Sequence, residues 1–112
     1  MGIITNFQAI NNTLEIGSIL NLVASSVYLS KYTCEGNIAL TDSACLDVTK
    51  AIYLTVTESQ FTNNSVSGVA SVMQITRSKT DITISSCNFS GNFANDKLTI
   101  LIIQSEVTFD KN

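Results

Sequence analysis

The sequence predicts an all-β protein: a right-handed parallel β-helix, a solenoid in which the chain winds through about five stacked coils. Three observations predict this fold. Similar segments recur at spacings of 20 to 29 residues, short runs alternate β-branched and polar residues, and no convincing amphipathic helix interrupts them. We assign the whole chain to one repeat segment, with coils near 1–25, 26–51, 52–79, 80–99 and 100–112.

The clearest repeat relates residues 52–64 (IYLTVTESQFTNN) to residues 80–92 (TDITISSCNFSGN), 28 positions further on. Five positions correspond in this alignment: Leu54 with Ile82, Val56 with Ile84, Ser59 with Cys87, Phe61 with Phe89, and Asn64 with Asn92. Within each copy one polar residue separates the apolar ones, a period of two that is typical of a strand with one buried face. Each copy therefore predicts a strand followed by a corner.

A third copy closes the sequence, where Phe109 and Asn112 repeat the Phe-x-x-Asn spacing 20 residues after Phe89 and Asn92. Two weaker copies lie upstream: Phe7 with Asn11, and Tyr32 with Asn37. We count three clear repeats and two degraded ones. Because one coil cannot bury both faces of its strands, successive coils are expected to stack about 4.8 Å apart.

The recurring Phe and Asn residues predict ladders along the stack. The aromatic ladder is expected at one corner, formed by Phe61, Phe89 and Phe109. Two interpretations stay open for Asn64, Asn92 and Asn112: inward amides that hydrogen-bond from coil to coil, or residues that tolerate a left-handed turn. Both interpretations give these residues a structural role.

The polar surface comes from uncharged side chains. Ser, Thr and Asn make 38 of the 112 residues, whereas 13% are charged and the net charge is −3. This composition suits a surface that faces water or carbohydrate, and it argues against nucleic acid as a partner. The longest apolar run, residues 98–103, is far too short for a membrane span.

The three cysteines Cys34, Cys45 and Cys87 match no metal-ligand spacing, and the chain has no His. Either Cys34 and Cys45 form a disulfide across a short loop, with Cys87 left as a thiol in the core, or all three are buried thiols. No motif implies a cofactor.

Three segments match the acceptor sequence for N-linked glycosylation, and they begin at Asn11, Asn63 and Asn88. A chain this rich in Asn, Ser and Thr contains about three such matches by chance. They matter only if the protein passes through a eukaryotic secretory pathway.

The segments FTNN, FSGN and FDKN resemble the Phe-x-x-Asn repeats of polymorphic outer-membrane protein adhesins and related pectate-lyase-like β-helix proteins. The resemblance covers residues 52–112 and, more faintly, the rest. It implies a right-handed parallel β-helix displayed outside the cell. The companion motif Gly-Gly-Ala-Ile of those repeats is echoed only by SGVA at 67–70 and GNIA at 36–39.

These features favour an extracellular or cell-surface scaffold, structural or adhesive, over an enzyme. No close Asp/Glu pair recurs at one strand position, and no His or serine-nucleophile motif is present. Because no capping segment is recognisable, we expect either a fragment of a longer β-helix or copies that stack into a filament. The expected partners are other copies or flanking coils, and carbohydrate or cell-surface receptors.

The alternative function is a carbohydrate-binding module, or a non-catalytic segment of a polysaccharide-active β-helix enzyme. Only Tyr28, Tyr32 and Tyr53 offer rings that stack on a sugar. The competing interpretation makes them fillers of the core or the corners.

Overall fold

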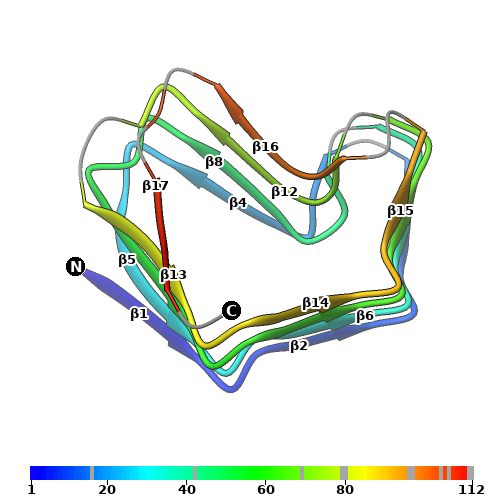
Figure 1. Cartoon of the computed structure of the whole chain (residues 1–112), viewed down its shortest axis with the longest axis horizontal. Coiled ribbons are helices and arrows are strands. Elements are labelled where there is room, and N and C mark those ends of the chain that lie inside the picture. The colour runs from blue at the N-terminus through cyan, green and yellow to red at the C-terminus, as the bar shows by residue number, and fades with distance from the viewer. Residues whose placement is uncertain are drawn as a thin grey trace.

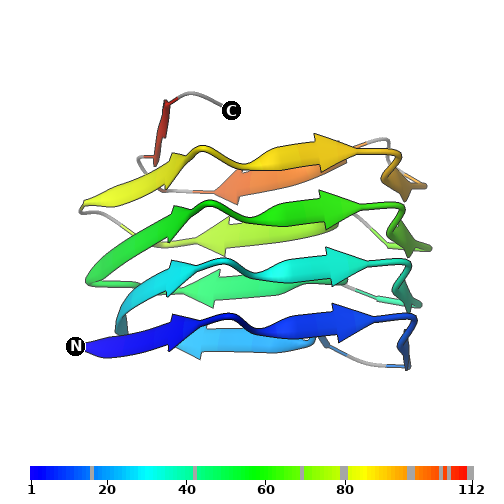
Figure 2. The same ribbon diagram turned by 90° about the horizontal axis from the view of Figure 1, so that it is seen from below.

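The computed structural model is a parallel β-solenoid, and it describes residues 1–15, 17–41, 43–68, 70–78, 81–95, 98–103, 105 and 107–110. Within these residues the regular structure consists of strands, with no helix. Figure 1 looks along the solenoid axis, and Figure 2 shows the coils stacked on one another with the N-terminus at one end. The chain turns counterclockwise in Figure 1 as it advances toward the viewer, so the solenoid is right-handed, as predicted.

Four parallel sheets form the sides of the solenoid. The first sheet has five strands: β1 (Gly2–Thr5), β5 (Ser26–Ser30), β9 (Tyr53–Thr57), β13 (Ile82–Ser85) and β17 (Val107–Asp110). The second has four: β2 (Gln8–Ile10), β6 (Thr33–Glu35), β10 (Gln60–Thr62) and β14 (Asn88–Ser90). The third has four: β3 (Thr13–Leu14), β7 (Ile38–Ala39), β11 (Ser65–Val66) and β15 (Phe93–Ala94). The fourth has four: β4 (Leu20–Val23), β8 (Leu46–Thr49), β12 (Ala70–Thr76) and β16 (Leu98–Ile103).

The strand register confirms the main repeat. Leu54 pairs with Ile82, Val56 with Ile84 and Phe61 with Phe89. Equivalent residues in successive coils lie 25, 27 and 28 positions apart at the second corner. The chain therefore repeats its cross-section once per coil, with small changes in loop length.

Positive-φ residues mark three of the corners and turn the chain from one sheet to the next. The first corner, between the first and second sheets, has Asn6, Lys31, Glu58 and Ser86 at φ between 50 and 55°. The second corner, between the second and third sheets, has Asn11, Gly36, Asn63 and Gly91 at φ between 55 and 66°. The third corner, between the fourth and first sheets, has Ala24, Lys50 and Arg77 at φ between 48 and 56°. These corners need no proline, and the sequence has none.

The core consists of aliphatic columns that run along the axis. In the first sheet, Leu29, Val56 and Ile84 are fully buried and occupy equivalent positions in three successive coils. The intervening residues Thr55 and Thr83 point outward. Burying each Val, Leu or Ile side chain stabilises the fold by about 1.5–3 kcal/mol, so the columns hold the coils in register.

The prediction of five coils is wrong in detail, as the strand pairing shows. Four complete coils are present, and β17 begins a fifth in the first sheet. The predicted boundary between residues 99 and 100 falls inside β16, which is the fourth side of the fourth coil.

The predicted position of Phe109 in the aromatic ladder is also wrong, because Phe109 pairs with Ile84 and not with Phe89. A coil has four sides, and the 20 residues after Phe89 are too few to complete them and return to the second sheet. Phe109 therefore reaches only the first sheet. Asn112, which was predicted from the same match, lies outside the described residues.

Candidate functional site

The second corner carries a ladder of inward asparagines that links all four coils. The Asn12 backbone N donates to Asn37 Oδ1 at 2.9 Å, the Asn37 N to Asn64 Oδ1 at 3.0 Å, and the Asn64 N to Asn92 Oδ1 at 3.0 Å. Each side-chain Nδ2 donates to the same oxygen as its own backbone N, at 3.0 Å. We call the set Asn12, Asn37, Asn64 and Asn92 the asparagine ladder.

The ladder also satisfies backbone carbonyls of the second sheet. Asn37 Nδ2 donates to the Ala9 carbonyl at 2.8 Å, and Asn64 Nδ2 donates to the Cys34 carbonyl at 3.0 Å. Both Asn37 and Asn64 are fully buried. A buried polar group without a hydrogen-bond partner costs about 1–3 kcal/mol. A shift of one coil against the next would break these hydrogen bonds, so they fix the alignment of the coils.

The inward interpretation holds for Asn64 and Asn92, because the left-handed residues of this corner stand one position before them. The residue with positive φ is Asn11, Gly36, Asn63 or Gly91, and the ladder asparagine follows it directly. Neither Asn64 nor Asn92 has a positive φ, so the left-handed interpretation is wrong for both. In the first coil the ladder member is Asn12, one position after the residue that the sequence alignment selected.

Side-chain size alternates along the positive-φ column of this corner. Asn11 Oδ1 and Asn63 Oδ1 occupy the space into which a Cβ on Gly36 or Gly91 would project. Asparagine and glycine therefore alternate from coil to coil, since each asparagine side chain needs a glycine in the next coil. The Asn-Asn and Gly-Asn dipeptides that recur at this spacing are the signal that could have located all four ladder residues.

A serine version of the same device lies at the third corner. The Ala51 backbone N donates to Ser78 Oγ at 2.9 Å, and the Ser78 N donates to Ser105 Oγ at 2.9 Å. At the first corner the Tyr32 N donates to Ser59 Oγ at 3.1 Å. Ser59 and Ser78 each follow a positive-φ residue, as the ladder asparagines do, and each accepts a hydrogen bond from the preceding coil. The sequence analysis missed these serines because Ser is abundant throughout the chain.

The aromatic ladder is confirmed for two of its three predicted members. The Phe61 and Phe89 rings stack with their centroids 5.0 Å apart, at an interplanar angle of 10°. A second stack joins Phe7 to Tyr32 at 5.2 Å, and the Tyr32 ring meets the Phe61 ring edge-on at 5.6 Å. These contacts contribute about 0.5–1.5 kcal/mol each beyond the burial of their area.

Cys34 and Cys45 form a disulfide, with their Cα atoms 6.0 Å apart. It joins β6 to the residue directly before β8 and so braces the second coil across its interior. Beside it, the buried Tyr32 donates its hydroxyl to the Cys45 carbonyl at 2.9 Å. Burial raises the pKa of the Tyr32 phenol well above its usual range.

Cys87 keeps its thiol, and 5% of the residue is exposed. It follows the first corner and donates to the Ser85 carbonyl at 3.2 Å. Burial raises the pKa of this thiol. A thiol in such a place is protonated and unreactive, as expected of a core residue.

The three glycosylation sequons lie on the exterior. Asn11, Asn63 and Asn88 are all exposed. Asn11 and Asn63 occupy the second corner, while Asn88 Nδ2 donates to Gln60 Oε1 at 3.1 Å. Modification of these residues stays a prediction.

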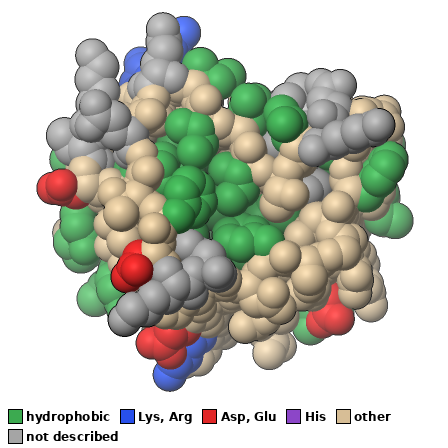
Figure 3. Space-filling view, viewed as in Figure 1, with side chains coloured by type: hydrophobic (Ala, Val, Ile, Leu, Met, Phe, Trp, Pro, Cys, Tyr) green, Lys and Arg blue, Asp and Glu red, His purple; other side chains and the backbone are tan. Residues whose placement is uncertain are grey.

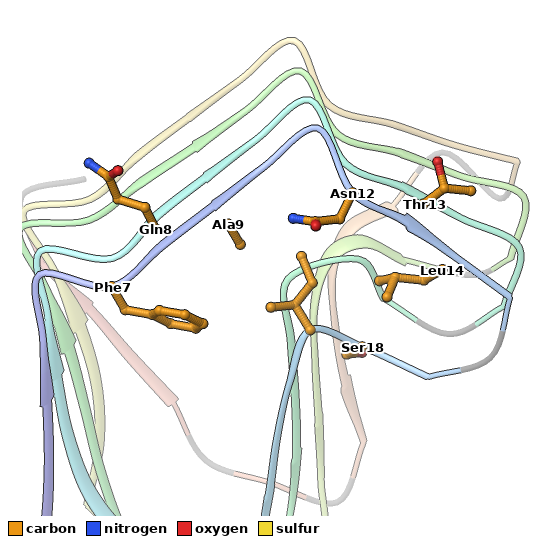
Figure 4. A pocket seen from close by; sticks show the side chains of 8 residues that line it. Phe7, Gln8, Ala9, Asn12, Thr13, Leu14 and Ser18 are labelled. Carbon is orange, nitrogen blue, oxygen red and sulfur yellow. The ribbon is translucent and has the colours of Figure 1, made fainter.

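The two ends of the solenoid expose apolar columns that are buried in the middle coils. Figure 3 looks onto the C-terminal end, where hydrophobic side chains gather in the centre of the face. Phe89, Ile100 and Val107 pack against the core there but are only partly buried. At the N-terminal end a hollow of about 390 Å³ opens beneath the first coil, between Phe7, Leu14 and Ile19. Figure 4 shows Phe7 and Asn12 among the side chains that line it.

The outward face of the first sheet is rich in hydroxyl groups. Tyr28 lies beside Thr55 in the neighbouring strand, and Tyr53 lies beside Ser26. The Thr55 Oγ1 donates to the Tyr53 hydroxyl at 2.9 Å. Tyr28 and Tyr53 are partly exposed, whereas Tyr32 belongs to the core. Two of the three tyrosines named as sugar-stacking candidates therefore share one face.

Among the described residues, no group of three or more Cys, Asp and Glu side chains is placed to hold a metal ion. The same part of the chain contains no helix long and apolar enough to cross a membrane. No family model, curated protein or solved structure matches the chain. The resemblance to adhesin repeats therefore stays a prediction, while the parallel β-solenoid is established.

Proposed function

We propose that this chain is an extracellular structural or adhesive scaffold. It is a rigid segment, and further coils of the same cross-section extend it at both ends. The asparagine ladder carries this proposal. Its geometry is the same at every step, so each end of the stack offers the groups that a further coil needs. At the C-terminal end these are the backbone N–H and side-chain amide of Asn92, and at the N-terminal end the side-chain oxygen of Asn12.

The size of the end faces supports assembly by stacking. The molecule measures 29 × 27 × 23 Å, and the solenoid axis is the shortest dimension. An elliptical end of these dimensions covers about 600 Å², so a junction between two copies would bury about 1,200 Å² in total, the lower bound of stable protein interfaces. Unpaired strand edges and half-buried apolar columns add a specific reason to associate.

The surface chemistry and the disulfide support a place outside the cell. Disulfides persist in oxidising compartments and are rare in the cytosol. The exterior is dominated by Ser, Thr and Asn, with few charges. The resemblance of the Phe-x-x-Asn segments to outer-membrane adhesin repeats points in the same direction.

Substitutions at the N-terminal end test this function. Leu20 begins an inward column that continues through Leu46 and Met73, whereas Asn21 is its outward neighbour. We expect Leu20→Lys to abolish concentration-dependent assembly in sedimentation velocity experiments, because a charge would then sit inside the junction. The matched variant Asn21→Lys should assemble as the unmodified chain does. A protein that stays monomeric at every concentration, before any substitution, would contradict the proposal.

A carbohydrate-binding module is the second candidate, favoured by Tyr28 and Tyr53 on the outward face of the first sheet. The rings offer stacking surfaces, and Thr55 with its neighbours offers hydroxyl groups, so a neutral glycan matches this face. A glycan array tests this candidate. Binding that Tyr53→Ala removes and Tyr32→Phe preserves would support it, and an array without binding would dismiss it.

A further inference from the structure

We propose that β17 and the β1 strand of a second copy compete for the same edge of β13, so that two copies join head to tail only by strand exchange in the first sheet. This inference rests on the proposed function. It goes further in two ways. It names a second copy of this chain as the molecule that binds the C-terminal end, and it names β17 as the strand that must leave the edge of β13.

The second corner fits a second copy without change. Each ladder asparagine donates its backbone N–H and Nδ2 to the side-chain oxygen of the asparagine one coil later. Within the described residues, no later asparagine accepts from Asn92, and no donor reaches Asn12 Oδ1. Stacking places Asn12 of a second copy directly after Asn92. Its Nδ2 would then meet the Phe89 carbonyl, as Asn92 Nδ2 meets the Phe61 carbonyl at 2.8 Å.

The positive-φ column of the same corner also continues across this junction. It reads Asn11, Gly36, Asn63, Gly91 through the four coils. Each asparagine side chain fills the space that a Cβ on the glycine of the next coil would need. Asn11 of a second copy would follow Gly91, so the alternation is kept. An odd number of coils would bring two residues of one kind together.

The first sheet presents the obstacle. It has five strands where each of the other three sheets has four, because β17 already lies on β13. Figure 2 shows β17 alone beyond the last complete coil. Within the described residues, no strand follows β14, β15 or β16 in its sheet, so β2, β3 and β4 of a second copy would find open edges there. In the first sheet, β1 of that copy would need the position that β17 holds.

The side chains of the two strands favour exchange. The inward column of the first sheet runs Ile4, Leu29, Val56, Ile84, and β17 adds Phe109 to it. Phe109 is 47% exposed in this position. β1 of a second copy would place Ile4 there, an aliphatic side chain like the rest of the column. In a single copy β17 covers the edge of β13, and in a stack it yields to β1.

Intermolecular disulfide formation tests the exchange. We would place Thr5→Cys in one batch of protein and Ser85→Cys in another, both with Cys87→Ala and the native disulfide kept. Thr5 is the first-sheet counterpart of Asp110, the residue that now pairs with Ser85. Exchange brings the new cysteines to about 4.8 Å, within bridging range. The matched control Thr57→Cys lies one coil deeper, about 10 Å from the same cysteine, and cannot bridge.

Two substitutions in β17 complete the test. Phe109→Asp puts a charge into the inward column and should release β17, which we expect to raise the yield of the Thr5→Cys/Ser85→Cys disulfide severalfold. Thr108→Asp changes the outward neighbour and should leave the yield unchanged. Stacked rods without this disulfide, even in the Phe109→Asp background, would overturn the exchange and leave the scaffold function standing. Absence of both rods and disulfide would remove the inference together with the proposed function.

Discussion

The Asn64 side-chain oxygen accepts two hydrogen bonds from Asn37, one from its backbone N and one from its Nδ2, each at 3.0 Å. The two residues belong to successive coils and are both fully buried. One amide thus joins two coils and satisfies the backbone at a sharp corner. Repetition of this relationship explains how a chain with few glycines and no proline builds a regular solenoid.

Replacing Asn64 should destabilise the stack strongly. Asn64→Ala would leave the buried Asn37 N–H and the Cys34 carbonyl without their partners. We expect a loss of about 3 kcal/mol in the free energy of unfolding, measured by urea denaturation followed by circular dichroism. The control Asn88→Ala removes an exposed amide and should cost no more than about 0.5 kcal/mol. Equal effects from both variants would refute a structural ladder.

Adding a single methyl group at Gly36 should also be costly. Gly36 has φ +65°, and a Cβ there would collide with Asn11 Oδ1. We expect Gly36→Ala to destabilise the fold by about 2–3 kcal/mol, of which about 1–2 comes from the left-handed backbone. The double variant Asn11→Gly/Gly36→Ala should recover the part due to the collision. If it recovers nothing, the alternation of asparagine and glycine has no energetic role.

Removing the disulfide should weaken the second coil. Cys34 and Cys45 enclose a loop with a sequence separation of 11. A loop of this length predicts a stabilisation of about 3 kcal/mol from restriction of the unfolded chain. Cys34→Ala/Cys45→Ala should lower the urea midpoint accordingly. Thiol titration of the unfolded, unreduced protein should count one reactive thiol, Cys87, and a count of three would contradict the disulfide.

Stability should fall at alkaline pH. Burial raises the pKa of Tyr32 in the folded protein, while an unfolded tyrosine titrates near its ordinary value of about 10. The stability that depends on the neutral phenol is therefore complete below pH ~9. It is lost as the pH rises above ~10, because the unfolded chain then releases a proton that the folded chain keeps.

The variant Tyr32→Phe separates this effect from general alkaline unfolding. It should be less stable at neutral pH by about 1 kcal/mol, since the bond to the Cys45 carbonyl is lost. Between pH 9 and 11 its free energy of unfolding should decline less steeply than that of the unmodified protein. Parallel pH profiles for the two proteins would show that Tyr32 does not carry the dependence.

The repeat that the sequence showed most clearly is also the one that the structure reproduces in register. Phe61 pairs with Phe89, and Leu54 with Ile82, as the 28-residue alignment predicted. Both coils keep the same loop lengths through this region, so one shift aligns strand, corner and ladder together. Core side chains at these positions are under packing constraint, which makes the pattern readable.

Phe109 shows where a short motif misleads. The two specified residues of the Phe-x-x-Asn pattern recur there, yet the strand pairs with β13 and not with β14. The pattern carries no information on how many sides of the coil precede it. Only β15 and β16 lie between β14 and β17, so counting strands would have shown that Phe109 reaches the first sheet, one side short of the second.

The sequence predicted only some members of the asparagine ladder, for a different reason. In the first coil two asparagines stand together, Asn11 and Asn12, and the sequence does not show which one turns inward. The structure separates them by backbone conformation, since Asn11 has φ 56°. In the second coil Gly36 has the positive φ and Asn37 is the ladder residue, so the left-handed residue again precedes the inward one.

The axial repeat of the native material that carries this chain tests the scaffold most directly, and cryo-electron microscopy can measure it. The account predicts rods in which stacked strands rise by about 4.8 Å along the axis, continuous across the junctions between successive solenoids. Compact particles of single solenoids, with no 4.8 Å repeat extending beyond their own four coils, would contradict it.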